Sequence, residues 1–332
     1  MHVLSSEAQI DILMATYNGE PYLTPQVESI KNQTYQNWQL LINDDGSEDA
    51  TQHLIIDLAK HDNRIKKLKL KNGQKDAAGN FFALLAASKA PYVMFCDQDD
   101  IWDRDKIELE YTFMKELEQK SGANKPLLVF TDSTIVDKNL KVMNPSFAST
   151  LSFNAQTISL PQLLVANVAQ GSTMLLNRKL ADMMLSFQVP ESIHMHDYWA
   201  FILCKLFGDS LFLPVSTMKY RQHCNNAIGA PNHQPTVLSG FQHALTEPDI
   251  ITNWLNRLSQ EEKFFCSRAQ ALVELFQNEL DFKILRTLNN LASISASTRT
   301  KREKISLIKE YRLIKYQKNL YTQLCQFVGI VC

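Results

Sequence analysis

Apolar residues along the first hundred positions fall into short runs that are separated by polar turns. Residues 10–15, 38–42 and 92–96 are apolar runs of strand length, and residues 65–70 alternate apolar positions with lysine. The segments between them, 20–31, about 50–60 and 80–87, carry apolar residues at helical spacing. Strands that alternate with helices in this way predict an α/β domain with a mostly parallel sheet flanked by helices.

The same alternation continues to about residue 223. It predicts helices at 106–120 and 179–185, a helix that opens near Asp197, and strands at 127–130, 171–176 and 210–214. Residues 139–160 lose periodicity, and two interpretations stay open: a lid that folds over a substrate, or a surface insertion.

Beyond residue 240 the strand pattern disappears. Helices are predicted at 250–258, 261–280, 282–292 and 301–328, after a polar linker at 225–240. We therefore predict a first domain over residues 1–230 and a helical C-terminal region over residues 231–332.

Composition narrows the class of protein. The chain has 332 residues, 45% of them hydrophobic, and a net charge of −1, so nothing indicates a nucleic-acid partner. Its six cysteines have no CxxC spacing, which favours reduced, buried thiols over a zinc site. The N-terminus lacks a signal-peptide pattern and no apolar stretch has the length of a membrane span, so we expect a cytoplasmic protein.

The C-terminal region is locally basic. Residues 299–318 hold eight Lys or Arg against Glu303 and Glu310, beside a stripe of apolar positions. One interpretation is an amphipathic helix that lies peripherally on the inner face of the plasma membrane. The other is a solvated face whose apolar side packs on the domain or on a second subunit of a homo-oligomer.

The candidate chemistry lies where the predicted strands end. Carboxyl ends of parallel strands meet at one edge of a sheet, where ligands bind. The polar residues found there are Thr16 and Asn18, then Asp44 and Asp45, then Asp97, Asp99 and Asp100. Carboxylates this close repel one another unless a positive charge, usually a hard divalent cation, sits between them. The alternative is an acidic loop in which Asp103 or Asp105 caps the next helix.

Several nucleotide-binding classes are disfavoured by what the strand ends lack. No GxGxxG follows the first strand and no GxxxxGK[ST] occurs, which counts against dinucleotide enzymes and P-loop proteins. A receiver domain also gathers acids at strand ends, but it is much shorter and needs a late lysine that this chain does not place.

Two later segments add candidates with more than one interpretation. Asp197 at a predicted helix start is either an N-cap or a general base, and His196 beside it is either a surface residue or part of that site. Arg221 and His223 offer a donor and a ligand that suit a diphosphate or a metal, although each also fits a structural role.

With these residues in order, the first 230 or so residues resemble the family 2 glycosyltransferases of the GT-A fold, nearest to their bacterial rhamnosyltransferase-like branch. The blocks that carry the resemblance are 15–19, 43–47, 80–82, 96–102, 171–173, 196–199 and 220–226. The sequence departs from the family pattern at Ser172, where cysteine is frequent, and at Cys224, where glycine is frequent. The last hundred residues are not covered by it.

The resemblance implies a role for each matching residue. Thr16 and Asn18, with Asp44 or Asp45, would hold the base and ribose of a nucleotide-sugar donor, and Asn80 would support the nucleotide. Asp97-Gln98-Asp99 would be the DxD motif, with Asp99 as direct ligand of Mn²⁺ or Mg²⁺, Asp97 beside it, and Asp100 near the sugar. Arg221 and His223 would bind the diphosphate or the metal. Asp197 of the His196-Asp197 pair would be the catalytic base.

The sequence therefore predicts a metal-dependent inverting glycosyltransferase that adds a sugar to a growing cell-surface glycan. L-Rhamnose from dTDP-rhamnose is the first candidate donor, and a lipid-linked glycan is the first candidate acceptor. One alternative is a nucleotidyltransferase that makes a nucleotide sugar, but residues 15–21 lack the glycines and basic residues that its N-terminal loop needs. The other is a non-catalytic scaffold or glycan-binding protein of the same fold, which would not need both Asp99 and Asp197.

Overall fold

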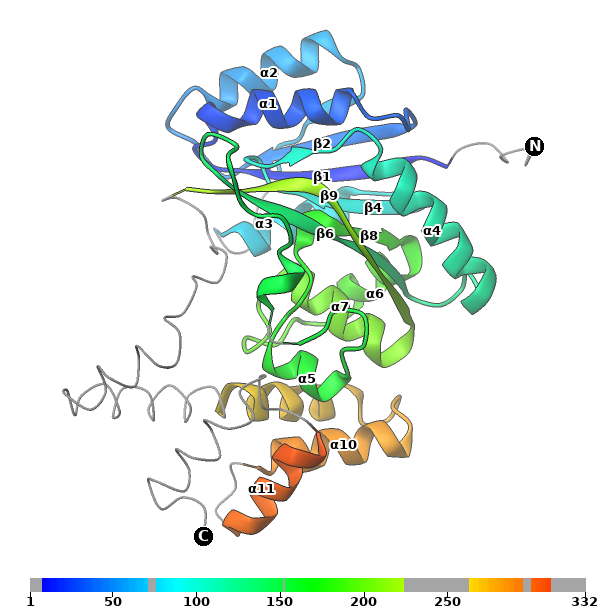
Figure 1. The fold of residues 1–332 in the computed structure, drawn as a ribbon. Coiled ribbons are helices and arrows are strands. Elements are labelled where there is room, and N and C mark those ends of the chain that lie inside the picture. Colours follow the sequence, from blue (N-terminus) through cyan, green and yellow to red (C-terminus); the bar gives the residue numbers. More distant parts are fainter. Residues whose placement is uncertain (1–7, 71–75, 152, 224–262, 295–299, 312–332) are drawn as a thin grey trace, which may run out of the picture. The chain divides into compact units, whose positions relative to one another are not determined.

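The structure is a computed structural model that describes residues 8–70, 76–151, 153–223, 263–294 and 300–311 (Figure 1). Contacts divide the chain into two compact units. The first is drawn from Met1–Thr150, Ala169–Val189 and His194–Ala230, and the second from Leu151–Val168, Pro190–Ile193 and Pro231–Cys332. The predicted domain boundary at residue 230 lies outside the described residues and stays a prediction.

The described strands of the first unit form one nine-stranded sheet in the order β3-β2-β1-β4-β8-β6-β9-β5, with β7 paired to β6. Their bounds are β1 Ile10–Thr16, β2 Trp38–Asp44, β3 Ile65–Lys67, β4 Tyr92–Cys96, β5 Ile101–Trp102, β6 Leu127–Asp137, β7 Val142–Asn144, β8 Met174–Asn177 and β9 Asp209–Gln222. The predicted strand at 65–70 is thus shorter than expected.

The first four strands of the sheet run parallel, and so do β6 and β9. β8 lies antiparallel between β4 and β6, and β5 is antiparallel to β9. The mostly parallel α/β sheet is therefore confirmed, with antiparallel strands that the sequence pattern did not distinguish. The predicted strand at 171–176 begins only at Met174, because Gly171–Thr173 forms a 3-10 turn, η2. The strand predicted at 210–214 is the start of the much longer β9.

Helices cover both faces of this sheet; Figure 1 shows α1 and α2 on one side and α6 and α7 on the other. The helices of the first unit are α1 Glu20–Lys31, α2 Thr51–His61, α3 Ala77–Ala87, α4 Lys106–Ser121, α6 Arg178–Ser186 and α7 His196–Phe207. α1 carries Pro21 in its first turn, where a missing N–H costs nothing. α3 starts three residues before the predicted position, because the Asp76 side chain accepts a hydrogen bond from the Gly79 N–H at 2.7 Å and caps it.

The core explains why the central strands are almost continuously apolar. Ile10, Ile12 and Met14 of β1 lie in one buried cluster with residues of α1 and α4. Leu13 between them is also fully buried but belongs to the opposite face, because successive side chains of a strand alternate. A strand that is covered on both faces must be apolar at nearly every position.

Part of the unperiodic segment 139–160 is ordered against the sheet. It contains β7 and the 3-10 turn η1, Ala148–Thr150, and Asp132 of β6 holds it by accepting hydrogen bonds from the Ala148 N–H at 2.9 Å and from the Ser146 hydroxyl. Whether this segment acts as a lid stays a prediction.

The described part of the second unit is helical. It contains α5 Leu160–Val165, a helix over residues 263–276, α10 Phe282–Ala292 and α11 Lys301–Glu310. The predicted helices at 261–280 and 282–292 are confirmed within these bounds, and the one at 301–328 is described only to Glu310. The helix predicted at 250–258 and the linker at 225–240 lie outside the described residues. Among the described helices, none is long and apolar enough to cross a membrane.

Cys96, Cys204 and Cys266 are buried free thiols, as predicted.

A buried ion pair joins α4 to the sheet. Lys106 and Glu110 contact each other with both side chains fully buried, and the Lys106 ammonium also donates to the Thr217 hydroxyl of β9 at 3.1 Å. Burial raises the pKa of Glu110 to about 7, against the lowering effect of the Lys106 charge. The pair is a structural element that the helix periodicity alone did not reveal.

Replacing Lys106 by Met is expected to destabilise the fold by about 3–5 kcal/mol at pH 8, because it leaves a buried carboxylate without its counter-charge. At pH 5 the loss should be smaller, since Glu110 is then already protonated in the folded state. Urea unfolding at both pH values measures this. The Lys106→Met, Glu110→Gln double variant should recover most of the stability, and an equal loss at both pH values would contradict the argument.

Candidate active site

The turns that follow β1 and β2 are joined to each other. The Thr16 hydroxyl donates to Asp44 Oδ2 at 3.0 Å, and the Asp45 N–H donates to the Thr16 carbonyl at 2.9 Å. Asp44 Oδ1 also accepts from the Ser47 N–H at 2.9 Å, which closes the β2 turn on itself. The structure therefore brings together Thr16, Asp44 and Asp45, as the strand-end argument predicted.

Asn18 stands at the tip of the β1 turn in the left-handed region, with φ of 47°, which asparagine tolerates better than most residues. Its N–H donates to the Ser47 hydroxyl at 2.8 Å, and its Oδ1 accepts from the Glu48 N–H at 2.9 Å. These contacts hold the turn against the β2 turn. The predicted role of Asn18 toward a nucleoside stays a prediction.

Asn80 is 1% exposed and lies behind these turns rather than at their surface. It exchanges hydrogen bonds with Asn43: Asn43 Nδ2 donates to Asn80 Oδ1 at 2.9 Å, and Asn80 Nδ2 donates to the Asn43 carbonyl at 3.0 Å. Asn80 thus ties α3 to the end of β2. Any support that it gives a nucleotide must pass through the β2 turn.

Asp97 comes directly after β4 and is held by Ser172 of η2. The Ser172 hydroxyl accepts from the Asp97 N–H at 3.0 Å and donates to Asp97 Oδ2 at 2.7 Å. Burial and then the charge of Asp99 raise the pKa of Asp97 to about 6, while the Ser172 hydrogen bond lowers it. A nearby cation would stabilise the deprotonated form of such a carboxyl.

Asp99 and His223 face each other. His223 Nε2 lies 2.7 Å from Asp99 Oδ2, both side chains are largely buried, and the imidazole stacks on the Tyr22 ring with centroids 4.6 Å apart. One oxygen and one imidazole nitrogen suit Mn²⁺ or Mg²⁺, and a cation with bonds of about 2.0–2.1 Å at right angles has neighbouring ligand atoms about 3 Å apart. Within the part of the chain that the structure describes, no three His, Cys, Asp or Glu side chains form a complete metal cluster.

Arg221 is built into the wall behind the acids. Its Nε donates to the Asp99 carbonyl at 2.6 Å, its Nη1 donates to the Lys138 carbonyl at 2.8 Å, and its N–H donates to Asp100 Oδ1 at 3.1 Å. It is 5% exposed, and it contacts the acidic turn through the Asp99 carbonyl and the Asp100 carboxyl. Asp100 is fully buried, and burial followed by the charges of Asp99 and Asp97 raises its pKa well above the usual range.

Asp197 lies close to this acidic turn. η2 joins the two, because Ser172 binds Asp97 while a Cβ on Gly171 would lie 3.5 Å from Asp197 Cβ. Burial raises the pKa of Asp197 to about 7; backbone hydrogen bonds lower it, and the Asp97 charge raises it further. The N-cap interpretation is wrong: α7 begins at His196 and its N-cap is Met195. Asp197 Oδ1 accepts from the Tyr198 N–H at 2.6 Å, and the carboxylate also accepts from the backbone N–H of Gly171.

His196 packs among aromatic rings, and its interpretation as a surface residue is wrong. It is 4% exposed, stacks on Phe81 at 4.0 Å and meets the edge of Phe95 at 4.5 Å. Among the described residues neither ring nitrogen has a hydrogen-bond partner, and burial lowers the pKa of the imidazole to about 3. His196 is therefore a neutral, buried ring that packs against Phe81 and Phe95 at the start of α7.

Sequence reasoning missed the contribution of Gln98 and Gly19. Gln98 occupies the middle of the Asp97-Gln98-Asp99 block, where side chains are read as spacers, yet its amide makes two hydrogen bonds to the backbone of Tyr17. Gly19 leaves the space for that amide. No spacing rule pointed to this pair, because the contact spans 81 positions.

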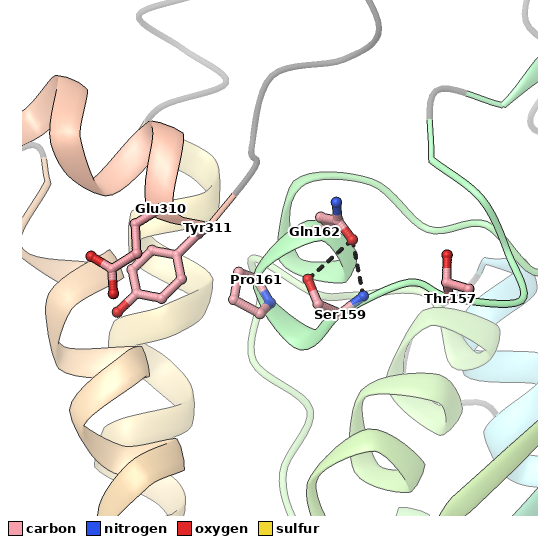
Figure 2. Close-up of a pocket in the computed structure, with 6 residues that line it drawn as sticks. All are labelled: Thr157, Ser159, Pro161, Gln162, Glu310 and Tyr311. Atoms are coloured by element: carbon pink, nitrogen blue, oxygen red, sulfur yellow. Dashed lines mark hydrogen bonds between the residues drawn. The ribbon is translucent and has the colours of Figure 1, made fainter.

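A pocket of ≈ 370 Å³ lies elsewhere, in the second unit. Figure 2 shows it between the start of α5 and the end of α11, with Ser159 and Gln162 joined by the hydrogen bonds of a capping box. Its lining residues are Thr157, Ser159, Pro161, Gln162, Glu310 and Tyr311. It contains none of the predicted site residues.

The first part of the chain, which holds the turns after β1, β2 and β4, is similar to a known protein family. The family model of glycosyl transferase family 2 matches residues 11–122, which hold β1 to β5 and α1 to α4. The chain is 35% identical over 105 residues to the Escherichia coli UDP-Glc:alpha-D-GlcNAc-diphosphoundecaprenol beta-1,3-glucosyltransferase WfgD, a match that covers 32% of this chain and 40% of that protein. The chain thus spans less than half the length of this curated relative.

A second relative matches over a longer stretch. The Shigella flexneri dTDP-rhamnosyl transferase RfbG is 27% identical over 227 residues, which are 65% of this chain and 74% of that protein. Among solved structures, S. aureus TarS in complex with UDP-GlcNAc superposes with a TM-score of 0.54 at 13% identity, over 91% of this chain and 80% of that one, which shows the fold alone. Residues 11–122 of this chain therefore match glycosyl transferase family 2, and its mixed sheet is of GT-A type.

Proposed function

We propose that this protein is a metal-dependent inverting glycosyltransferase that moves a sugar from a nucleoside diphosphate donor to a growing glycan. The observation that carries the proposal is the convergence of Asp99, His223 and Asp197 at one edge of the sheet, although they come from three distant segments. Such a transfer needs two side chains that can bind a cation and a separate carboxyl that can take a proton.

The donor would lie along the joined turns of β1, β2 and β4. We assign the nucleoside to the β1 and β2 turns with Thr16, Asn18, Asp44 and Asp45, and the diphosphate to the Asp97–Asp100 turn. Asp99 and His223 would hold Mn²⁺ or Mg²⁺, and Asp97 is close enough to add charge. When bound, the cation would offset the negative charge that grows on the departing nucleoside diphosphate. A site with two protein ligands suits a cation that keeps waters and phosphate oxygens as its other ligands.

Asp197 is the group that we assign to the acceptor. Its carboxyl is half-buried and its raised pKa makes it a stronger base than an ordinary aspartate. It would take the proton of the acceptor hydroxyl while that oxygen attacks the anomeric carbon. Among the residues that the structure describes we assign one base and no nucleophile, and this assignment favours a single displacement, which inverts the anomeric configuration.

The finer identities are proposals that rest on the relatives. The name of the Shigella flexneri relative supports dTDP-rhamnose as first donor to test, and the diphosphoundecaprenol in the name of the Escherichia coli relative supports a lipid-linked acceptor. We assign nucleotide-sugar binding and transfer to residues 1–230. The basic C-terminal segment would bring the enzyme to a membrane that carries such an acceptor.

The test is a donor panel with the purified full chain and Mn²⁺: dTDP-rhamnose, UDP-glucose and UDP-GlcNAc, with release of nucleoside diphosphate as readout. We expect one donor to be turned over, the turnover to stop with a chelator, and the product anomer, read by NMR, to be inverted. Release of pyrophosphate from a nucleoside triphosphate would favour the nucleotidyltransferase instead. A folded protein that binds none of the donors would overturn the proposal.

A further inference from the structure

The turns after β1 and β4 are joined beyond the point where their strands stop pairing. The parallel pairing of β1 with β4 ends at Met14 and Cys96. Past it, Gln98 Oε1 accepts from the Tyr17 N–H at 3.0 Å, and Gln98 Nε2 donates to the Tyr17 carbonyl at 2.9 Å. Only one orientation of the amide makes both bonds, so the side chain extends the sheet by one rung.

Gly19 leaves the space that this amide occupies, because it has no side chain. A Cβ at Gly19 would lie 2.2 Å from Gln98 Oε1 and 2.5 Å from Gln98 Cδ, and the three nearest atoms to it all belong to the Gln98 side chain. Gly19 has φ of −101°, which other residues adopt readily. The need for glycine here is therefore a need for space, and it is set by Gln98.

We propose that Gln98 and Gly19 form a clamp that fixes the nucleoside-binding turn at the correct distance from the diphosphate- and metal-binding turn. Gln98 is a positioning residue in this proposal, and its own atoms need not touch the donor. The inference rests on the proposed function, since it assigns the two turns to two parts of one donor molecule.

The physical reason is preorganisation. Tyr17 is 56% exposed and Asn18 beside it has a positive φ. Without the clamp, the described contacts of this turn are those of Asn18 with the β2 turn and of Gly19 with Thr51 at the start of α2. A donor that spans both turns must then order the tip when it binds, which reduces its apparent affinity by the fraction of molecules that are already competent. A ligand that uses only the metal-binding turn loses nothing.

The experiment compares two ligands by calorimetry, each with Mn²⁺: the nucleoside diphosphate, dTDP or UDP, that binds the wild type, and inorganic pyrophosphate. For Gln98→Ala we expect the Kd of the nucleotide to rise about tenfold, the loss of one or two net hydrogen bonds, while pyrophosphate binding is unchanged. Gln36→Ala, which removes an exposed amide before the other end of β2, should change neither. Equal weakening of both ligands would mean general damage and would overturn the proposal.

A double-mutant cycle tests the clamp itself. Gly19→Ala should weaken nucleotide binding as Gln98→Ala does, because it expels the amide, and the double variant should be no weaker than Gln98→Ala alone. The same non-additivity is expected in urea unfolding without any ligand. Additive effects would overturn the clamp. If neither nucleotide binds the wild type, the proposed function fails and the positioning role fails with it, whereas binding that Gln98→Ala leaves unchanged overturns this inference alone.

Discussion

Replacing Asp197 by Asn is expected to lower kcat by about 10²- to 10⁴-fold, the usual contribution of a general base, with the donor KM unchanged. The amide oxygen of Asn can still accept from the Tyr198 N–H, so the start of α7 should stay in place. The variant lacks only the atom that takes a proton from the acceptor. Steady-state kinetics with saturating acceptor measure the effect.

The pH dependence gives this prediction a second, independent readout. A base works when it is deprotonated, and the pKa of Asp197 is about 7, so the wild-type rate should rise with pH and level off above about 7. The folded state binds the proton of Asp197 more tightly than the unfolded chain does. Its stabilising effect is complete below the unfolded pKa of about 4 and is lost as the pH rises through about 7.

The same sign predicts the stability of the variant. At pH 8 the Asp197→Asn protein should melt at a higher temperature than wild type, and at pH 5 the difference should shrink. Glu191→Gln, which neutralises an exposed acid shortly before the same helix, serves as a matched control and should leave rate and melting temperature unchanged. A variant that loses activity together with stability at pH 8 would point to a structural role for Asp197.

Replacing Asp99 by Asn is expected to abolish metal-dependent binding of the nucleotide. The change removes the negative charge that faces His223 at 2.7 Å. Loss of an outer-shell partner alone costs about 10- to 100-fold in metal affinity, so loss of a direct ligand should exceed that. Titration of Mn²⁺ by electron paramagnetic resonance, with and without nucleoside diphosphate, measures it.

The matched control is Asp103→Asn. Asp103 lies four positions away, carries the same charge and pairs with Lys219 at a more exposed position, so Mn²⁺ affinity should be retained. His223→Ala should weaken Mn²⁺ as Asp99→Asn does, because both side chains are assigned to one ion. If Asp99→Asn binds Mn²⁺ like wild type while Asp97→Asn does not, the ligand assignment within the acidic turn is wrong.

Much of the first unit was predictable because its signals are local. The apolar runs of β1, β2 and β4 have strand length and end in polar residues, so alternation alone placed the turns of Thr16, Asp44 and Asp97 at one edge. The antiparallel direction of β8 was not predictable. The apolar run in Met174–Asn177 carries no signal of strand direction, and its partner strands are far away in the chain.

The sequence by itself determined which groups could do chemistry: carboxylates at strand ends, a histidine and an arginine near residue 222, and an acid at the start of α7. Only the tertiary structure decided which of these side chains are buried and which groups they contact. It buried His196 among Phe81 and Phe95, turned Arg221 toward backbone carbonyls, and placed His223 against Asp99. It also gave Gln98 a partner in Tyr17. The physical reason is that the exposure, charge and hydrogen bonds of a side chain depend on neighbours brought together by the sheet, which residue spacing does not encode.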